Sequence, residues 1–357
     1  MLPEWRLLDD GIHEARHHFA IEEAIARQLD AGQSPPTLRL RQVNPSVFIG
    51  VHQNTWDEVD VDYCRKHNIQ IVRRMNGGGA VYHEMGSFCY SAFFPRVMFN
   101  QTDQEIYHLF AEPVIRTCSD YGLVAKFGGR NDVLTGGRKI YGSAQFSWYS
   151  AFVQSGTFLV NMNFDAMERS LTPHNLKYQN RPVQSIKERV TSLSTEVGRI
   201  IPVREVMELF VKHFASTFGF HLTPGDLSEA ESSLALKLLE SKYDTEQWNF
   251  GSQLAFEMNI AERTEEGVIS LSVELEDQII KRVRISGDIL FNQPSVLCDL
   301  ERNLTGIHIQ NAENVIKLTP LPENVVRSLS QLFKKLETEA VDVTSTKRKE
   351  KSSWARE

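Results

Sequence analysis

The chain has 357 residues, 41% hydrophobic and 24% charged, a composition that excludes a wholly disordered protein and is long enough for two domains. Lys and Arg number 39 against 46 Asp and Glu, and the net charge of −7 argues against nucleic acid as a main partner. No apolar run reaches the roughly 18 residues that span a bilayer, and the start lacks a secretory or transit signal. We therefore expect a cytoplasmic protein without a membrane partner. Its four cysteines contain no C-x-x-C pair, so neither a zinc ribbon nor a redox dithiol is indicated.

The first half of the chain alternates helical and extended patterns. Apolar residues at helical spacing predict helices over 15–29, 57–66 and 103–121, and Gly122 suits the end of the last one. Alternating or β-branched runs predict strands over 38–43, 46–50, 69–73 and 87–94. Strands are next expected over 138–141, 142–148 and 151–160. Mixed strands and helices of this kind indicate an α/β (α+β) domain around one sheet.

The pattern changes after about residue 250. Before that point, helices are predicted over 203–218 and 228–243, the second with Ser228 and Glu231 in a capping-box pattern. Strands over 255–262, 267–274 and 278–286 then suggest an antiparallel meander that turns at Gly287-Asp288, before helices over 296–304 and 322–336. We expect a mixed-sheet catalytic domain over 1–246, a small α+β accessory domain over 247–337 and a disordered, solvated tail over 338–357.

A glycine-rich segment follows the predicted strand 69–73. It reads Arg73-Arg74-Met75-Asn76-Gly77-Gly78-Gly79-Ala80-Val81-Tyr82-His83. Three consecutive glycines let a ligand approach backbone N–H groups, and the two arginines supply charge and forked donors. This favours a site for phosphate or another anion, although a Gly-rich turn after a strand can also be only a turn.

Two further segments strengthen this interpretation. One is Gly129-Arg130-Asn131-Asp132 with Gly137-Arg138-Lys139-Ile140-Tyr141-Gly142-Ser143-Ala144-Gln145, and the other is Gln184-Ser185-Ile186-Lys187-Glu188-Arg189-Val190-Thr191-Ser192-Leu193. In order and spacing, the three segments together resemble the signatures of the lipoate–protein ligase family, which has the biotin/lipoate ligase fold. Asn76 stands where that family usually has serine, and Ser155 stands where it usually has histidine.

The resemblance implies a two-step reaction that needs ATP, Mg²⁺ and the substrate lipoate. Lipoate is activated to lipoyl-AMP, and the lipoyl group then passes to a lysine of an acceptor protein. The implied acceptors are lipoyl domains of 2-oxoacid dehydrogenase E2 subunits or the glycine-cleavage H protein. The sequence does not choose between these acceptors, or between lipoate and octanoate.

Lys139 is the predicted catalytic residue, because its ammonium can bridge the lipoate carboxylate and the α-phosphate. The alternative is an ordinary surface lysine. Arg74 is expected to bind an anion in bidentate fashion, whereas Arg73 can be a structural partner. Asp132 is expected to hold Mg²⁺, or to be a simple turn aspartate. Aromatic stretches at 88–94 and 146–158 can wall an apolar lipoate tunnel, although most of these rings are expected in the core. The residues predicted to bind lipoate or ATP are Arg74, Asn76, Gly77, Gly78, Gly79, Ala80, Val81, His83, Asn131, Asp132, Gly142, Ser143, Ala144 and Thr157.

Further functions stay open. Octanoyl- and lipoyl-transferases of the same fold use a cysteine nucleophile, but Asn131-Asp132 stands where that cysteine would lie. A transferase that uses preformed lipoyl-AMP also stays open, as does a non-catalytic lipoate-binding homologue. Biotin ligation is disfavoured, because the G-R-G-R pattern of biotin ligases is absent. The segment from His13 to His17 fits the zinc motif H-E-x-x-H. We expect it to be the frayed first turn of a helix instead, since Gly11 lies two residues upstream.

Overall fold

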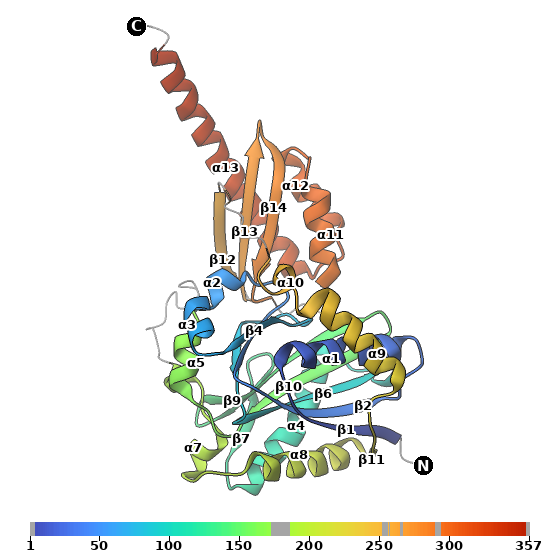
Figure 1. Cartoon of the computed structure of the whole chain (residues 1–357). Coiled ribbons are helices and arrows are strands. Elements are labelled where there is room, and N and C mark those ends of the chain that lie inside the picture. Colours follow the sequence, from blue (N-terminus) through green and yellow to red (C-terminus); the bar gives the residue numbers. More distant parts are fainter. Residues whose placement is uncertain are drawn as a thin grey trace.

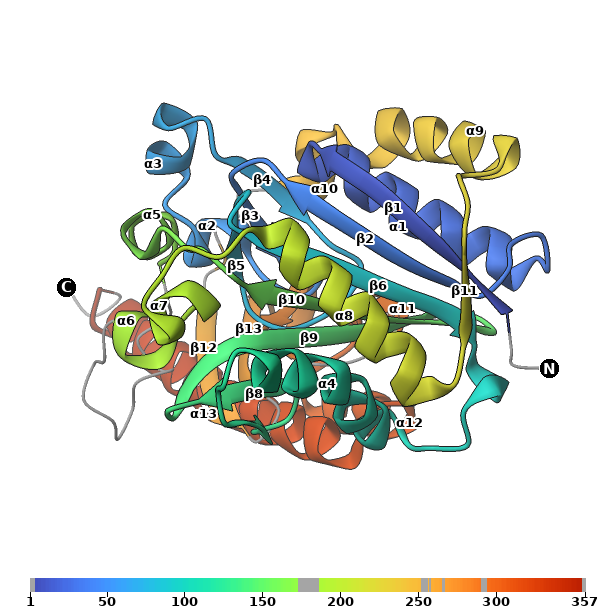
Figure 2. The same cartoon turned by 90° about the horizontal axis from the view of Figure 1, so that it is seen from below.

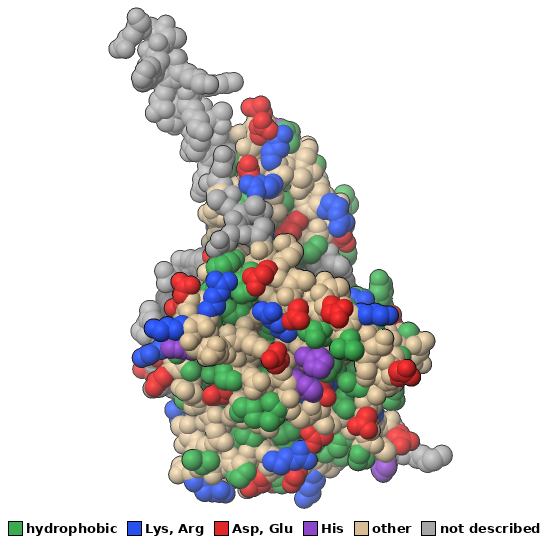
Figure 3. Space-filling model, in the orientation of Figure 1, with side chains coloured by type: hydrophobic (Ala, Val, Ile, Leu, Met, Phe, Trp, Pro, Cys, Tyr) green, Lys and Arg blue, Asp and Glu red, His purple; other side chains and the backbone are tan. Residues whose placement is uncertain are grey.

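The computed structural model describes residues 4–172, 186–251, 256, 258–264, 267–289 and 294–354, without the side chains of residues 187, 294, 295 and 339–354. Gln184 and Ser185 of the third signature lie outside the described residues, as do residues 255 and 257 of the predicted strand 255–262. Two parts are stacked in Figure 1, with the smaller, C-terminal part above the larger one. No helix in the described ranges is long and apolar enough to cross a membrane. On the face shown in Figure 3, acidic and basic side chains are interspersed over both parts.

The larger part is built on a mixed sheet. In the described chain its eight strands have the order β11-β1-β2-β6-β10-β9-β8-β7. Strand β1 runs parallel to both of its neighbours. The other neighbouring pairs, β2-β6, β6-β10, β10-β9, β9-β8 and β8-β7, are antiparallel. The strands are β1 (Glu4–His13), β2 (Thr37–Val43), β6 (Ser87–Pro95), β7 (Ala125–Gly128), β8 (Asp132–Thr135), β9 (Arg138–Trp148), β10 (Ala151–Leu159) and β11 (His221–Pro224).

Helices cover both faces of this sheet (Figure 2). Because side chains alternate along a strand, β6 sends Phe88, Tyr90 and Phe94 to one face and Cys89 and Phe93 to the other. The first group packs in an aromatic-rich core with α4 (Asp103–Asp120) and α8 (Val203–Phe218). The second group packs with α1 (Ala15–Asp30), α9 (Glu229–Leu238) and the π-helical turn η3 (Leu239–Tyr243).

A second, three-stranded sheet carries the glycine-rich segment. Its order is β4-β3-β5, with β3 (Ser46–Ile49), β4 (Gln70–Arg73) and β5 (Val81–His83). The glycine loop connects β4 to β5 and is therefore fixed at both ends. Short helices surround this sheet and the turns of the larger part: α2 (Thr55–Glu58), α3 (Val61–Lys66), η1 (Arg96–Met98), α5 (Phe164–Ser170), α6 (Ile186–Arg189), α7 (Leu193–Val197) and α10 (Glu246–Asn249).

The smaller part has its own core. An antiparallel sheet of β12 (Met258–Thr264), β13 (Gly267–Glu276) and β14 (Ile279–Gly287) packs against helices. These are α11 (Pro294–Leu304), η4 (Ile309–Asn311), α12 (Ala312–Leu318) and α13 (Glu323–Trp354). The buried residues of this core, such as Leu271, Leu300 and Phe333, all come from residues 269–336.

The predicted fold class is confirmed, and so is the Ser228–Glu231 capping box. Several elements differ from the predictions. The prediction that the H-E-x-x-H motif forms the frayed first turn of a helix is wrong, because His13 ends β1 and α1 begins only at Ala15. Residues 138–148 form one strand rather than two, and 57–66 contributes to two short helices. The backbone of α13 is helical as far as Trp354, within the segment 338–357 predicted as a tail, whose mobility stays a prediction. The domain boundary at residue 246 also stays a prediction.

Candidate active site

The register of the large sheet places residues from several sequence segments in one row. Thr157 of β10 lies opposite Cys89 of β6 and Gly142 of β9. Gly142 in turn lies opposite Asp132 of β8, and Cys89 lies opposite Arg41 of β2. Residues paired in this way present their side chains to the same face of a sheet. The row therefore crosses five strands and measures roughly 19 Å, at about 4.8 Å per strand spacing.

A cavity of about 640 Å³ lies along this row, with the glycine loop on its wall. The structure brings all of the predicted site residues together around it: Arg74, Asn76, Gly77, Gly78, Gly79, Ala80, Val81, His83, Asn131, Asp132, Lys139, Gly142, Ser143, Ala144 and Thr157. Their placement in one cavity is an observation, whereas their individual roles stay predictions.

Lys139 lies near the start of β9 on the cavity wall. Its Nζ is 2.7 Å from Oδ1 of Asp132, and its side chain is 32% exposed. A Cβ added to Gly142 would come within 2.4 Å of Nζ, so the glycine leaves the space that the end of the lysine occupies. The N–H of Thr191, from the third signature, donates to the Lys139 carbonyl at 2.8 Å and fixes the backbone there. The ammonium of Lys139 therefore lies on the cavity wall beside the carboxylate of Asp132. An incoming anion can compete with that carboxylate for the ammonium.

Of two buried arginines, Arg74 holds the glycine loop in shape and Arg73 holds the segment that follows β3. Arg74 donates to the carbonyl oxygens of Phe48 at 2.9 Å, Gly77 at 2.7 Å and Gly79 at 2.9 Å. Arg73 donates to backbone carbonyls that follow β3, in the structural role that the sequence allowed. Burial lowers the pKa of each guanidinium to about 10, which still leaves both charged at neutral pH. The bidentate contact of Arg74 with a ligand stays a prediction, because its hydrogen bonds in the structure go to the loop.

The smaller, C-terminal part, which we call the accessory part, contacts the glycine loop. The contact comes from its turn at residues 287–289, which we call the accessory turn. The N–H of Gly78 donates to the carbonyl of Ile289 at 3.0 Å, and the N–H of Gly287 donates to the carbonyl of His52 at 2.8 Å. Asp288, between these two bonds, borders the cavity. One of the backbone donors that the sequence offered to an anion is thus bonded to the accessory turn.

His83 and Cys89 form a buried pair on the cavity wall. The His83 ring stacks on Phe48 with centroids 3.9 Å apart, and its Nδ1 lies 3.6 Å from Sγ of Cys89. Burial, together with the neighbouring Arg74 and Arg41, lowers the pKa of His83 well below its usual value. Burial raises the pKa of the Cys89 thiol. Both groups are therefore neutral at neutral pH, and a neutral thiol is a poor nucleophile.

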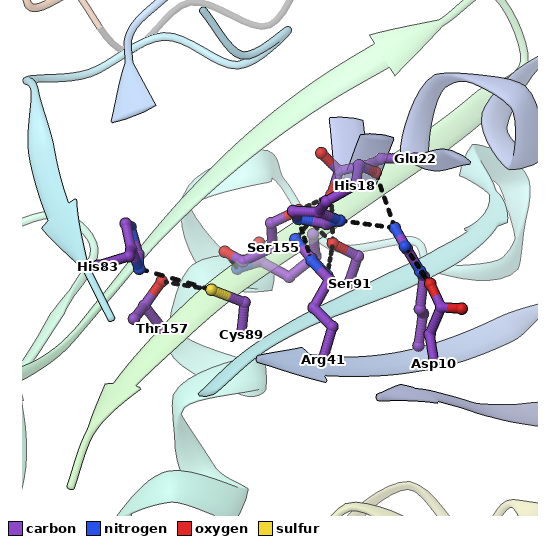
Figure 4. A network of polar contacts seen from close by, with 11 residues as sticks. Asp10, His18, Glu22, Arg41, His83, Cys89, Ser91, Ser155 and Thr157 are labelled. Atoms are coloured by element: carbon purple, nitrogen blue, oxygen red, sulfur yellow. Dashed lines mark hydrogen bonds and ion pairs between the residues drawn. The ribbon is translucent and has the colours of Figure 1, made fainter. Parts of the chain in front are cut away.

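A second polar group, which we call the inner polar cluster, consists of His18, Glu22, Arg41, Ser91 and Ser155 (Figure 4). Oε1 of Glu22 accepts hydrogen bonds from Ser155 at 2.9 Å, from Arg41 at 3.3 Å and from Ser91. Arg41 also donates to Ser91 at 2.9 Å and to His18. Glu22, Arg41 and Ser155 line the cavity. The sequence identified Ser155 only as a departure from the family pattern and did not identify Glu22 or Arg41.

The apolar wall differs from the expected one. Within 88–94 and 146–158, Cys89, Ser155, Gly156 and Thr157 line the cavity, whereas the aromatic rings of these stretches do not. Phe19, Phe48 and Tyr82 supply the aromatic lining instead. Further apolar lining that the sequence did not single out comes from Leu134, Leu159, Met167, Leu171, Ile186 and Val190.

The described residues contain no group of three or more His, Cys, Asp or Glu side chains that could hold a metal ion. In the H-E-x-x-H segment, Nε2 of His13 lies 3.0 Å from Asp10, and the His13 and His17 rings meet edge to face at 5.1 Å. This segment therefore forms a local hydrogen bond and ring contact at the junction of β1 and α1.

Residues 14–215 match the lipoyl protein ligase A/B catalytic domain family, and residues 253–320 match the bacterial lipoate protein ligase C-terminus family. The lipoate-protein ligase LplJ of Bacillus subtilis is 30% identical over 284 residues, which cover 78% of this chain and 83% of that protein. The octanoyltransferase LipM of Symbiobacterium thermophilum is 30% identical over 273 residues, which cover 70% of this chain and 99% of that protein.

Solved structures give the same grouping. A bi-partite lipoate protein ligase from Thermoplasma acidophilum, described with its E2 lipoyl domain, has a TM-score of 0.63 at 30% identity, covering 72% of this chain and 100% of that chain. A lipoate-protein ligase A bound with ATP has a TM-score of 0.62 at 30% identity, covering 70% of this chain and 99% of that chain. The family matches and relatives thus define an enzyme of the lipoyl protein ligase class. Within that class the chain belongs to the lipoate–protein ligase family, as its three signatures predicted.

Proposed function

We propose that this protein is an ATP-dependent lipoate–protein ligase. The carboxylate of lipoate attacks the α-phosphorus of ATP, which gives lipoyl-AMP and releases pyrophosphate. A lysine amine of the acceptor protein then attacks the acyl carbon, forms an amide and displaces AMP. The observation that carries the proposal is the position of Lys139 on the wall of the cavity that residues 77–79 also border.

The first step brings two anions together, and a fixed cation lowers their repulsion. Lys139 is suited to this task, because its ammonium has three donor hydrogens and forms an ion pair with Asp132 in the free protein. A substrate carboxylate and the α-phosphate can use the other donors. The same ammonium then stabilises the charge that develops on the α-phosphate as the new bond forms.

The glycine loop supports phosphate binding, since Arg74 already holds it in one shape. Backbone N–H groups of residues 77–79 are the proposed donors to phosphate oxygens. The N–H of Gly78 has to exchange its bond to Ile289 for one to phosphate. Nucleotide binding should therefore loosen the contact between the accessory turn and the loop.

ATP implies Mg²⁺, and Asp132 is the residue proposed to hold it. Magnesium in nucleotide sites commonly uses one or two carboxylates together with phosphate oxygens and water. The carboxylate of Asp132 lies on the cavity wall with 28% of its side chain exposed, so this donor set fits such a shared site. The ion would offset phosphate charge when bound.

The comparisons support the proposed substrates and acceptor. One relative's structure holds ATP, and another is described with an E2 lipoyl domain. We therefore propose lipoate and ATP as the small-molecule substrates and lipoyl domains of E2 subunits as acceptors. The glycine-cleavage H protein, which the family resemblance also implies, is an alternative acceptor.

The similarity to an octanoyltransferase favours acyl transfer through a cysteine as the second candidate. Such transfer needs a thiolate within reach of the acyl carbon. Among the described residues that line the cavity, the cysteine is Cys89, and its thiol is buried and neutral. The ligase reaction is therefore the function that the site supports best.

Mass spectrometry of an apo lipoyl domain incubated with lipoate, Mg-ATP and this protein tests the proposal. We expect lipoylation of one lysine together with AMP and pyrophosphate, and a rate lowered about 100-fold or more in Lys139→Ala. Lys126→Ala, an exposed lysine of β7 that does not line the cavity, is the matched control. Lipoylation from preformed lipoyl-AMP but not from lipoate and ATP would identify a transferase. No product from either donor would identify a non-catalytic homologue.

A further inference from the structure

The inner polar cluster lies at the opposite end of the cavity from Lys139. The row of paired residues runs from Asp132, the partner of Lys139, across Gly142 and Thr157 to Arg41. An acyl chain that binds along this row with its carboxylate at Lys139 extends across the strands toward Arg41 and Glu22, which also line the cavity. Whatever group ends that chain meets the inner polar cluster.

This end of the cavity contains unused hydrogen-bonding capacity. Oε1 of Glu22 accepts three hydrogen bonds, but its Oε2 is buried and has no hydrogen-bond partner in the described part of the chain. Glu22 exposes only 1% of its surface and Arg41 only 2%, so bulk water does not reach them freely. A buried acceptor without a partner is unfavourable, and such groups in native proteins call for an explanation. A donor on a bound ligand would supply the missing partner.

Arg41 provides the complementary group. Each of its three nitrogens makes one hydrogen bond, to His18, Ser91 or Glu22. A guanidinium has five N–H donors, so two remain beyond these three bonds. The charges of Arg41 and Glu22 offset each other, and so do those of Arg39 and Asp10 beside His18. Burial next to Arg41 and Arg39 keeps His18 neutral by lowering its pKa. The inner end is therefore polar but carries no net charge, which suits a neutral polar group better than a second ion.

We propose that the inner polar cluster selects acyl acids whose distal end carries a neutral hydrogen-bonding group over acids that end in a methyl group. This selectivity rests on the proposed function, because the direction of the chain follows from a carboxylate placed at Lys139. A hydroxyl or thiol can donate to Glu22, and the sulfur atoms of a dithiolane are weak acceptors for Arg41. A methyl end offers neither, so the cluster favours lipoate-type acids over octanoate.

The test compares 8-hydroxyoctanoate with nonanoate, which has the same number of chain atoms but ends in a methyl group. Pyrophosphate release with Mg-ATP gives kcat/KM, and calorimetry without ATP gives Kd for the same acids. We expect the wild-type protein to prefer 8-hydroxyoctanoate about tenfold in both measurements. Equal kcat/KM and Kd values for the two acids, or a preference for nonanoate, would overturn the proposed selectivity. Selective binding without pyrophosphate release from lipoate would overturn the proposed function alone.

The double variant Glu22→Leu/Arg41→Met assigns the selectivity to the cluster. Both charges are removed together, because a single change would leave a buried charge without its partner. We expect the preference for the hydroxylated acid to disappear. The matched control is Arg6→Met/Glu231→Leu, which removes a buried ion pair of 2.6 Å between β1 and α9 away from the cavity.

The control is expected to lower the melting temperature in a similar way while keeping the tenfold preference. Should the double variant fail to fold, Ser155→Ala removes one hydrogen bond to Glu22 from the cavity wall, and we expect about a threefold smaller preference. A folded double variant, or a folded Ser155→Ala protein, that keeps the full preference would show that the cluster serves only the fold.

Discussion

The position of the Lys139 amine depends on a residue without a side chain. In Gly142→Ala the new Cβ would lie 2.4 Å from Cε and Nζ of Lys139, so the end of the lysine must move away from its place beside Asp132. Because the displaced atoms end a flexible side chain, we expect little change in the melting temperature. Displacement of a catalytic group by about 1 Å can lower a rate about 100-fold, and pyrophosphate release should fall by that order. A Gly142→Ala protein with the wild-type rate would contradict the assignment of Lys139.

A single histidine should make stability depend on pH. His83 is buried, and its pKa in the folded protein lies well below the value of about 6.5 in the unfolded chain. Between those two values the unfolded state binds more protons, so the free energy of unfolding falls as the pH drops below about 6.5. The slope for one such side chain is at most about 1.4 kcal/mol per pH unit.

Urea titrations at pH 7.5, 6.5 and 5.5 measure this dependence. Since His18 is buried and neutral for the same reason, the comparison has to be made between the wild-type protein and His83→Asn. We expect the variant to lose less stability between pH 6.5 and 5.5 than the wild-type protein does. Equal slopes in the two proteins would mean that His83 can take up a proton without leaving its buried position.

The sequence identified most of the cavity residues in the first two signatures and missed most of the others, including those of the third signature. Residues 77–79 stand in a segment whose composition favours an anion site, and the role of Lys139 follows from the family resemblance of its segment. Glu22 instead sits in an ordinary amphipathic helix, and Arg41 in a short alternating strand. The available signal was that Arg39 and Arg41 alternate with Leu38 and Leu40, which predicts two cations on one face of a strand. Their partners became evident only from the register of β2, β6 and β10.

At the scale of elements, long periodic segments were predictable and short or two-sided ones were not. Helix α8 was predicted with its observed bounds, because its apolar stripe faces one core. The strands β5, β7 and β8 are three or four residues long and were not predicted, whereas the equally short β3 and β4 were, because apolar, β-branched runs mark them. Gly142 suggested a break within 138–148, yet β9 continues through it because the glycine makes room for a side chain rather than a turn.

The glycine loop depends on a close approach to the end of β3. A Cβ added to Gly50 would lie 2.0 Å from the carbonyl oxygen of Gly78, and a backbone atom cannot move away as a side-chain end can. Overpacking of this kind costs about 1–3 kcal/mol, so we expect Gly50→Ala to lower the free energy of unfolding by that amount. In the matched variant Gly79→Ala the nearest atom is 3.9 Å away, and the loss should be smaller. Urea denaturation that ranks the two variants in the opposite order would contradict this account of the loop.

At the scale of the whole molecule, the two parts have separate cores but share the cavity. The hydrophobic clusters of the larger part end at Phe250, and the cluster of the accessory part is drawn from residue 258 onward. The accessory turn nevertheless borders the cavity with Asp288 and accepts a hydrogen bond from Gly78. We therefore expect the larger part to fold without the accessory part, whereas the complete cavity needs both.

A fragment of residues 1–251 tests that separation. It retains Tyr243 and Phe250, and also Asn249, whose side chain accepts a hydrogen bond from the N–H of Arg73 at 3.0 Å. We expect a cooperative thermal transition and a native near-ultraviolet circular dichroism spectrum. The 30% identical chain of the bi-partite Thermoplasma ligase, matched over its full length by 72% of this chain, supports that expectation. The control fragment 1–236 lacks these three residues and should melt without cooperativity, because it loses parts of two cores. A fragment 1–251 without a cooperative transition, or a fragment 1–236 of equal stability, would show that the larger part does not fold as an independent unit ending near Phe250.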